Sequence, residues 1–148
     1  MRGGGGAVVN VSSTSALGHG RRPSGAPAYD VAKAGVLRLT SMLAFLGVDA
    51  NIRVNCIVPD WVATPEVRGY WEALTPDQRS SQGIPSRLTP VEAIADAVLW
   101  LATDDSLAGR ALVWWSDDEP RLIPWGDPGY ASLEPPHGFF RKTDVGAV

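Results

Sequence analysis

Hydrophobic and polar positions follow two different periods along the chain. Short continuous apolar runs at 7–11, 52–58 and 111–115 predict three strands that are covered on both faces. Apolar residues recur every three or four positions over 29–46, which predicts a long helix between the first two strands. The face of this helix that we expect to be buried consists of Val31, Ala32, Gly35, Val36, Leu39, Met42, Leu43 and Leu46.

The polar stretch after the second predicted strand is punctuated by proline. It predicts short helices at 66–74 and 76–82. Thr89 followed by Pro90 then predicts an N-cap and a first helical residue, and this helix should run to about residue 102. Strands that alternate with helices must pair in parallel through crossovers. The predicted fold class is therefore α/β.

Composition and charge limit the classes of function. The 148 residues are 45% hydrophobic and 20% charged, which predicts one globular unit with a modest core. The net charge of −3 provides no basic patch, so we expect no nucleic-acid partner. No run approaches the roughly 18 apolar residues of a membrane span, and no charged leader precedes an apolar segment. We therefore expect a soluble cytoplasmic protein with no membrane partner.

Cysteine and histidine give little indication of special chemistry. Cys56 is the only cysteine, so it cannot form an internal disulfide, and it lies in an apolar run that predicts a buried strand residue. His19 and His137 have no partner at metal-ligand spacing, so we predict no metal site.

Polar side chains gather where the predicted strands end. Ser12 and Ser13 end the first strand, and residues 59–64 follow the second. The carboxyl ends of parallel strands meet at one edge of a sheet, where ligands bind. Tyr29 and Lys33 are one helical turn apart near the start of the following helix, so their side chains project from the same face.

Tyr29 and Lys33 form a pair suited to proton transfer. A free tyrosine has a pKa of about 10 and exchanges protons poorly at neutral pH. An ammonium close by, together with the positive end of a helix, favours the phenolate. A serine hydroxyl from the neighbouring strand could hold a carbonyl oxygen while the tyrosine gives or takes a proton. This pattern indicates interconversion of a carbonyl and an alcohol.

The chain resembles the short-chain dehydrogenase/reductase family over residues 4–112. The segments that carry the resemblance are 7–13, the Tyr29-x-x-x-Lys33 pair, 52–59 and 61–65. They are similar to the family's serine-bearing strand, its catalytic pair, the next strand and the loop at the nicotinamide end of the cofactor. Each segment is weak alone, but their order and spacing together are typical of this family.

The resemblance implies roles for individual residues. Ser13 matches the family's catalytic serine better than Ser12, because it is the second of the pair after the asparagine-containing strand, and it would hold the substrate carbonyl oxygen. Alternation along the strand lets only one of the two serines face the site. Tyr29 would be the general acid in reduction and the general base in oxidation, and Lys33 would assist it and bind the nicotinamide ribose. The residues implied along the nicotinamide side of NAD or NADP are Pro59, Val62 and Thr64. Each of the three positions also has an alternative without a catalytic role. Ser13 would then be a turn serine that bonds its own backbone, Tyr29 an aromatic that packs on the loop, and Lys33 a solvated lysine.

The family's first half, a strand and a glycine-rich turn that opens a helix, has no match here. Gly3–Gly6 precedes a strand, so we interpret it as a linker and not as a phosphate-binding loop. We expect residues 1–115 to be the C-terminal part of the family's domain, with a partial Rossmann-like parallel sheet made of the last strands of a doubly wound domain and with flanking helices. We expect 116–148, rich in proline, glycine and aromatics, to be a partly irregular tail.

The sequence also departs from the family pattern. Asp60 stands where glycine commonly follows the proline, which predicts altered local geometry at the cofactor. Residues 116–119 replace the common aspartate-glycine-glycine ending. The basic segment 18–23 shapes the substrate mouth or is an ordinary surface loop. The tail aromatics dock on a neighbouring subunit, cover the substrate opening, or belong to a loosely packed end.

Two hypotheses for function follow. The first is an NAD(P)-dependent oxidoreductase that acts on a small-molecule carbonyl or secondary alcohol, represented by a chain that lacks the dinucleotide-binding half. The second is a non-catalytic remnant that acts as an oligomerisation module, because the first strand has lost its usual neighbour and the Tyr29 helix is one that members of the family use to dimerise. We expect a homo-oligomer.

Overall fold

A computed structural model describes residues 4–18, 26–124 and 126 of the chain. Its elements are β1 (Gly6–Val11), the 3-10 helix η1 (Thr14–Leu17), α1 (Pro27–Met42), α2 (Leu46–Asp49), β2 (Ile52–Pro59), α3 (Pro65–Glu72), α4 (Pro76–Ser81), α5 (Val91–Thr103), β3 (Ala111–Trp114) and β4 (Arg121–Leu122). The three predicted strands are confirmed. His19, His137, most of the basic loop and nearly all of the tail after residue 124 lie outside the described residues.

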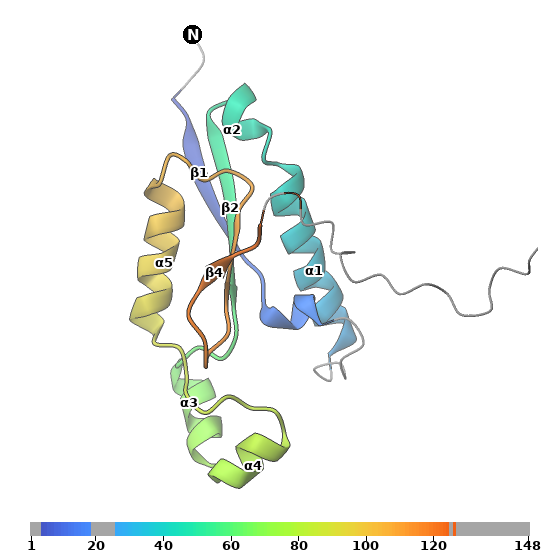
Figure 1. The fold of residues 1–148 in the computed structure, drawn as a ribbon, viewed down its shortest axis with the longest axis vertical. Helices are drawn as coiled ribbons and strands as arrows, with labels where there is room; N and C mark the ends of the chain where they lie inside the picture. Colours follow the sequence, from blue (N-terminus) through green and yellow to red (C-terminus); the bar gives the residue numbers. More distant parts are fainter. Residues whose placement is uncertain (1–3, 19–25, 125, 127–148) are drawn as a thin grey trace, which may run out of the picture.

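The four strands form one sheet in the order β1-β2-β3-β4. β1 pairs with β2 and β2 with β3 in parallel, whereas β4 returns antiparallel to β3. Figure 1 shows α1 on one side of the sheet and α5 on the other. The α/β fold class with a mostly parallel sheet and flanking helices is therefore confirmed. β4 was not predicted, because its two residues are too few to show a period.

β2 is the centre of the core, because both of its faces are covered. Ile57 packs towards α5 in one cluster with Leu101 and Leu112. Cys56 and Val58 belong to a second cluster, against which α1 and η1 pack. Cys56 is fully buried as predicted, and this burial raises the pKa of its thiol. Such two-sided burial explains why the strand reads as a continuous apolar run and not as an alternating one.

Asn55 is the one amide in this apolar strand. Its Nδ2 donates to the carbonyl oxygens of Leu101 and Leu107, each at 2.9 Å. Its Oδ1 accepts from the backbone N–H of Arg110 at 3.0 Å. The buried side chain thereby satisfies three backbone groups where α5 ends and the chain enters β3.

α1 differs from its prediction in length and in its buried face. It ends at Met42, and a short turn separates it from α2. Val31 is 72% exposed and Met42 is 60% exposed, although both belong to the face that we expected to be buried. Val36 packs against the sheet as expected, and the fully buried residue of the helix is Thr40, which was not predicted. A wide apolar helix surface does not reveal which part of it the described sheet covers.

The N-cap predicted for Thr89 is wrong. α5 begins at Val91 with Pro90 as its cap residue, and no side chain caps it. The Thr89 hydroxyl bonds to Ser116 Oγ at 3.2 Å, and its backbone forms a parallel bridge with Val62. Thr89 therefore contacts residues that are distant in sequence, and these tertiary contacts could not be predicted from the local capping pattern.

We predict that Asn55→Leu destabilises the fold without changing its secondary structure. Leucine leaves two buried carbonyls and one buried N–H without partners, each worth about 1–3 kcal/mol, so the free energy of unfolding should fall by about 3 kcal/mol or more. Chemical denaturation followed by circular dichroism measures this loss. Asp105→Ala, which removes an exposed carboxylate that pairs with Arg53, is the control and should change little. Equal stability of the two variants would contradict the role given to Asn55.

Candidate active site

The three parallel strands end at one edge of the sheet, and the candidate residues lie there. In Figure 1 this is the lower end of the sheet, where η1, the first turn of α1 and the α3–α4 segment also lie. Polar groups that follow β1 and β2 in the sequence are therefore brought to one rim, as the parallel order requires.

Ser12 and Ser13 face in different directions. Ser12 is 2% exposed, and its Oγ donates to the carbonyl oxygen of Lys33 at 2.7 Å, so it anchors α1 on the strand. Ser13 is half-buried and caps η1, where its Oγ accepts from Ser15 N at 3.3 Å. Among the described residues the Ser13 hydroxyl has no acceptor for its own proton. Of the pair, Ser13 is therefore the one able to donate to a bound ligand.

Tyr29 and Lys33 share one face of α1, as their spacing predicted. The Lys33 ammonium lies 5.4 Å from the centre of the Tyr29 ring. Lys33 Nζ also donates to the carbonyl oxygen of Val11 at 2.9 Å. Tyr29 is 47% exposed. The lysine therefore ties the start of α1 to the end of β1, two residues before Ser13, and leaves the phenol open to solvent.

The three residues predicted along the cofactor lie on the stretch from the end of β2 to the start of α3. Pro59 is buried as the last residue of β2. The carbonyl oxygen of Val62 accepts from Thr64 N at 2.7 Å. Thr64 caps α3, since its hydroxyl oxygen accepts from Val67 N. Within the described part of the chain, no side-chain hydrogen bond joins these three residues to Ser13, Tyr29 or Lys33.

Asp60 does not distort the backbone as its replacement of glycine led us to expect. Asn51 is the only non-glycine residue with positive φ among the described residues, so Asp60 has an ordinary conformation. Its Oδ1 accepts from Thr14 Oγ1 at 2.9 Å, and its Oδ2 accepts from Ser116 N at 3.3 Å. The side chain thus connects the segments that follow all three parallel strands. The sequence marked Asp60 as unusual but did not show these partners.

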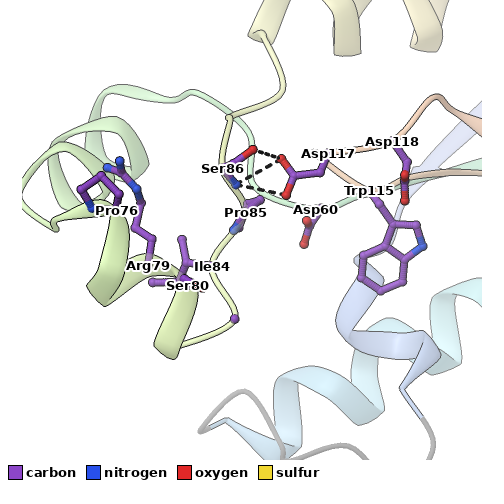
Figure 2. A pocket seen from close by; sticks show the side chains of 11 residues that line it. Asp60, Pro76, Arg79, Ser80, Ile84, Pro85, Ser86, Trp115, Asp117 and Asp118 are labelled. Carbon is purple, nitrogen blue, oxygen red and sulfur yellow. Dashed lines mark hydrogen bonds between the residues drawn. The ribbon is translucent and has the colours of Figure 1, made fainter.

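A large open cavity of about 770 Å³ lies beside this edge. Figure 2 shows that it separates the α4 side of the α3–α4 segment from the turn after β3. Asp60, Arg79, Ile84, Trp115 and Asp118 contribute to its walls. Ser13, Tyr29 and Lys33 are not among its lining residues. The cavity therefore adjoins the polar edge without containing the three predicted catalytic side chains.

Asp117 fastens the two sides of this cavity together. Its carboxylate accepts from the Ser86 backbone N–H at 3.0 Å and from the Ser86 hydroxyl at 2.7 Å, as the dashed lines in Figure 2 show. It also accepts from the Arg87 N–H at 3.2 Å. Desolvation acts to raise the pKa of Asp117, but the bonds from Ser86 and Arg87 outweigh it and hold that pKa below its usual value.

The described residues show neither a metal cluster nor a membrane-spanning helix. They contain no group of three or more histidine, cysteine, aspartate or glutamate side chains placed to hold a metal ion. None of the helices described is both long enough and apolar enough to cross a membrane.

Comparison with protein families finds one that accounts for most of the chain. Residues 1–113 match the family model described as enoyl-(acyl carrier protein) reductase. Among curated proteins, the chain is 38% identical over 102 residues to the cis-4-hydroxycyclohexanecarboxylate dehydrogenase of Sinomonas cyclohexanicum. That alignment covers 68% of this chain and 39% of the relative.

Solved structures of dehydrogenases also superpose on most of this chain. The 3-hydroxyacyl-CoA dehydrogenase type-2 of Mycobacterium avium superposes with a TM-score of 0.63 and 31% identity, covering 80% of this chain and 44% of that one. A 7α-hydroxysteroid dehydrogenase in complex with NADH and 7-oxoglycochenodeoxycholic acid superposes with a TM-score of 0.61 and 28% identity, covering 77% and 44% of the two chains. The chain thus spans about two fifths of the length of the relatives that it matches.

We predict that the contact between Asp117 and Ser86 is lost in acid. Because the pKa of Asp117 in the folded chain is lowered, its bonds should be fully present above about pH 4 and should weaken as the pH falls further. The NMR shift of the Ser86 amide, followed against pH, measures this. Asp117→Asn should abolish the transition, and Asp118→Asn, which removes a neighbouring carboxylate, should leave it in place. A Ser86 transition that persists in Asp117→Asn would contradict the assignment.

Proposed function

Because this chain belongs to the short-chain dehydrogenase/reductase family, we propose that it forms the catalytic half of an NAD(P)-dependent oxidoreductase that interconverts a carbonyl and a secondary alcohol. The observation that carries the proposal is the position of Lys33. Its ammonium bonds the end of β1 and lies over the Tyr29 ring, next to the turn that carries Ser13. A serine hydroxyl, a phenol and an ammonium therefore gather at the edge where α/β sheets bind ligands.

Each of the three side chains has a role in the proposed reaction. The free Ser13 O–H donates to the carbonyl oxygen of the substrate and holds it. The Tyr29 O–H gives its proton to that oxygen in reduction, and the phenolate takes the proton back in oxidation. Lys33 holds its ammonium beside the phenol ring and, through its bond to Val11, keeps the start of α1 next to the turn that carries Ser13.

The residues present fit a nicotinamide cofactor, either NAD or NADP. The cofactor would supply or accept the hydride, while the protein orients the reactants and provides the charges. Lys33 uses one of its three N–H donors on Val11, so two remain for the hydroxyls of a ribose. Thr64 accepts a bond from Val67 N and keeps its own O–H available to donate. We propose that Pro59, Val62 and Thr64 line the nicotinamide side of the cofactor.

The proposal requires a dinucleotide-binding part in addition to the described elements. In the described sheet β1 is an edge strand that pairs only with β2, and its residues Val8 and Val11 are exposed. The relatives are more than twice as long as the aligned part of this chain. We propose that the part of the enzyme that binds the rest of the dinucleotide lies against β1, whether in the same polypeptide or in another.

The cavity between α4 and the turn after β3 is our candidate for the mouth that admits a small-molecule substrate. It is large, it adjoins the edge that carries Ser13 and Tyr29, and one of its walls contains Asp60 of the loop after β2. Its carboxylates disfavour substrates that carry negative charge on this side.

A second function, self-association, is supported by a specific observation. Leu39, Met42, Phe45 and Val48 recur at every third position from α1 into α2, and all are exposed. A group of large exposed apolar side chains close together in sequence is typical of an interface. We propose that a second copy of the chain covers it, which gives a homo-oligomer whether or not the chain is catalytic.

We predict that Tyr29→Phe abolishes turnover without unfolding the protein. In the polypeptide that joins this chain to its dinucleotide-binding part, loss of the phenol O–H should lower the rate of NAD(P)H-linked turnover at least about 100-fold. The thermal midpoint should stay near that of the wild type, because the ring is half exposed. Tyr70→Phe removes the same hydroxyl from another exposed tyrosine, on α3, and should keep full activity. Unchanged turnover in Tyr29→Phe would end the catalytic assignment.

We predict that charge on the apolar surface of α1 breaks the oligomer. The double substitution Leu39→Glu and Met42→Glu should convert the assembly to monomers, because burying two carboxylates without partners is costly. Sedimentation velocity measures the change. Gln82→Glu adds a carboxylate at an exposed position after α4 and should leave the assembly intact. A wild-type chain that is monomeric at high concentration would rule out self-association through this surface.

A further inference from the structure

The two places where the sequence departs from its family meet in space. Asp60 follows the proline that ends β2, and Ser116 belongs to the altered segment after β3. Asp60 Oδ2 accepts from the Ser116 N–H at 3.3 Å, and the Asp60 N–H donates to the carbonyl oxygen of Trp114 at 3.0 Å. These contacts join the chain just beyond β2 to the chain just beyond β3.

The Ser116 hydroxyl also bonds to Trp61 and Thr89. Its Oγ accepts from the Trp61 N–H at 3.0 Å and from Thr89 Oγ1 at 3.2 Å, and it donates to the carbonyl oxygen of Trp61 at 3.1 Å. A hydroxyl has one donor and two acceptor positions, so all of its bonding capacity is used. Ser116 and Thr89 are both buried. The network therefore fixes the position of Asp60 relative to the ends of β2 and β3.

The other oxygen of Asp60 reaches the serine-bearing turn. Oδ1 accepts from Thr14 Oγ1 at 2.9 Å, and Thr14, which is buried, is the first residue of η1 and the neighbour of Ser13. A hydrogen bond to an ionised carboxylate is shorter and stronger than one between neutral groups. Glycine at position 60 would leave the buried Thr14 hydroxyl without this acceptor. The side chain thus links the catalytic turn to the rigid ends of β2 and β3.

We propose that Asp60 is a positioning residue for Ser13. Acting through Thr14, its carboxylate fixes the turn after β1, so that the Ser13 hydroxyl is held in one place relative to Tyr29. This proposal rests on the catalytic role given above to Ser13 and adds a residue to the machinery at a position where glycine is common in the family. A reacting group displaced by about 1 Å can cost about 100-fold in rate, so fixing this turn affects turnover.

The first experiment measures the turn itself and does not depend on activity. Amide hydrogen exchange is followed in this chain and in its Asp60→Gly, Asp60→Asn and Thr14→Val variants. The reporter is the Ala16 N–H, which donates to the Ser13 carbonyl oxygen at 3.0 Å. The reference is the Gly109 N–H, which lies before β3 and donates to the Val54 carbonyl oxygen of β2 at 2.8 Å. Asp60→Gly and Thr14→Val should speed exchange at Ala16 about tenfold or more relative to Gly109.

Asp60→Asn is the conservative variant in this series. Its remaining amide oxygen can still accept from Thr14, so Ala16 should be protected to an intermediate degree. The double variant Asp60→Gly with Thr14→Val should behave like either single variant, because both remove the same bond. Equal acceleration at Ala16 and Gly109 would mean a general loss of stability and would overturn the proposal.

The second experiment measures catalysis in the polypeptide that contains the dinucleotide-binding part. Asp60→Gly and Thr14→Val should lower kcat about tenfold or more, with the KM for the cofactor within about twofold of the wild-type value. Asp105→Gly, a matched change at an exposed aspartate, should leave kcat unchanged. If Tyr29→Phe abolishes turnover while Asp60→Gly matches the wild type, the positioning role fails and the proposed function stands. If Tyr29→Phe itself matches the wild type, the proposed function fails.

Discussion

Parallel pairing of β2 between β1 and β3 is the constraint on which the rest of the molecule depends. Because the three strands run the same way, the segments that follow them must all emerge at one edge. The crossover helices that parallel pairing requires cover the two faces, which buries β2 from Val54 to Pro59. The same arrangement puts Asn55 among backbone groups that need partners and places Ser13, Tyr29 and Asp60 within one region. Core and candidate site are therefore consequences of one topology.

Features with a local cause could be predicted from the sequence. The strands were visible as apolar runs, and the one-turn spacing of Tyr29 and Lys33 was enough to put their side chains on the same face. The alternation of a strand showed that only one serine of the Ser12-Ser13 pair could face the site, and in the structure the Ser12 hydroxyl donates to the carbonyl oxygen of Lys33. Each of these predictions uses only the geometry of a single element.

Features that depend on distant partners could not be predicted. Thr89 has the sequence context of a helix cap, yet its hydroxyl bonds to Ser116, 27 residues away. Asp117 belonged to an acidic run with no visible partner, and its partner Ser86 is 31 positions away. The apolar surface of α1 showed a helix but not which side meets the sheet. In each case the deciding contact is tertiary, and it overrides the local preference.

The α3–α4 segment is fastened in two different ways. Its two ends pair with each other through the main chain, since the Thr89 N–H donates to the Trp61 carbonyl oxygen and the Ala63 N–H donates to the Thr89 carbonyl oxygen. Near the turn after β3 the segment is held by side chains: the Asp117 carboxylate accepts from Ser86 and Arg87, and Arg87 Nε donates to the Ser116 carbonyl oxygen at 2.7 Å. Main-chain pairing resists changes in pH and salt, whereas bonds to an exposed carboxylate do not. Acid therefore acts on one part of this attachment only: it removes the bonds to Asp117 and leaves the main-chain pairing and the Arg87 bond in place, so one wall of the cavity is less firmly held at low pH.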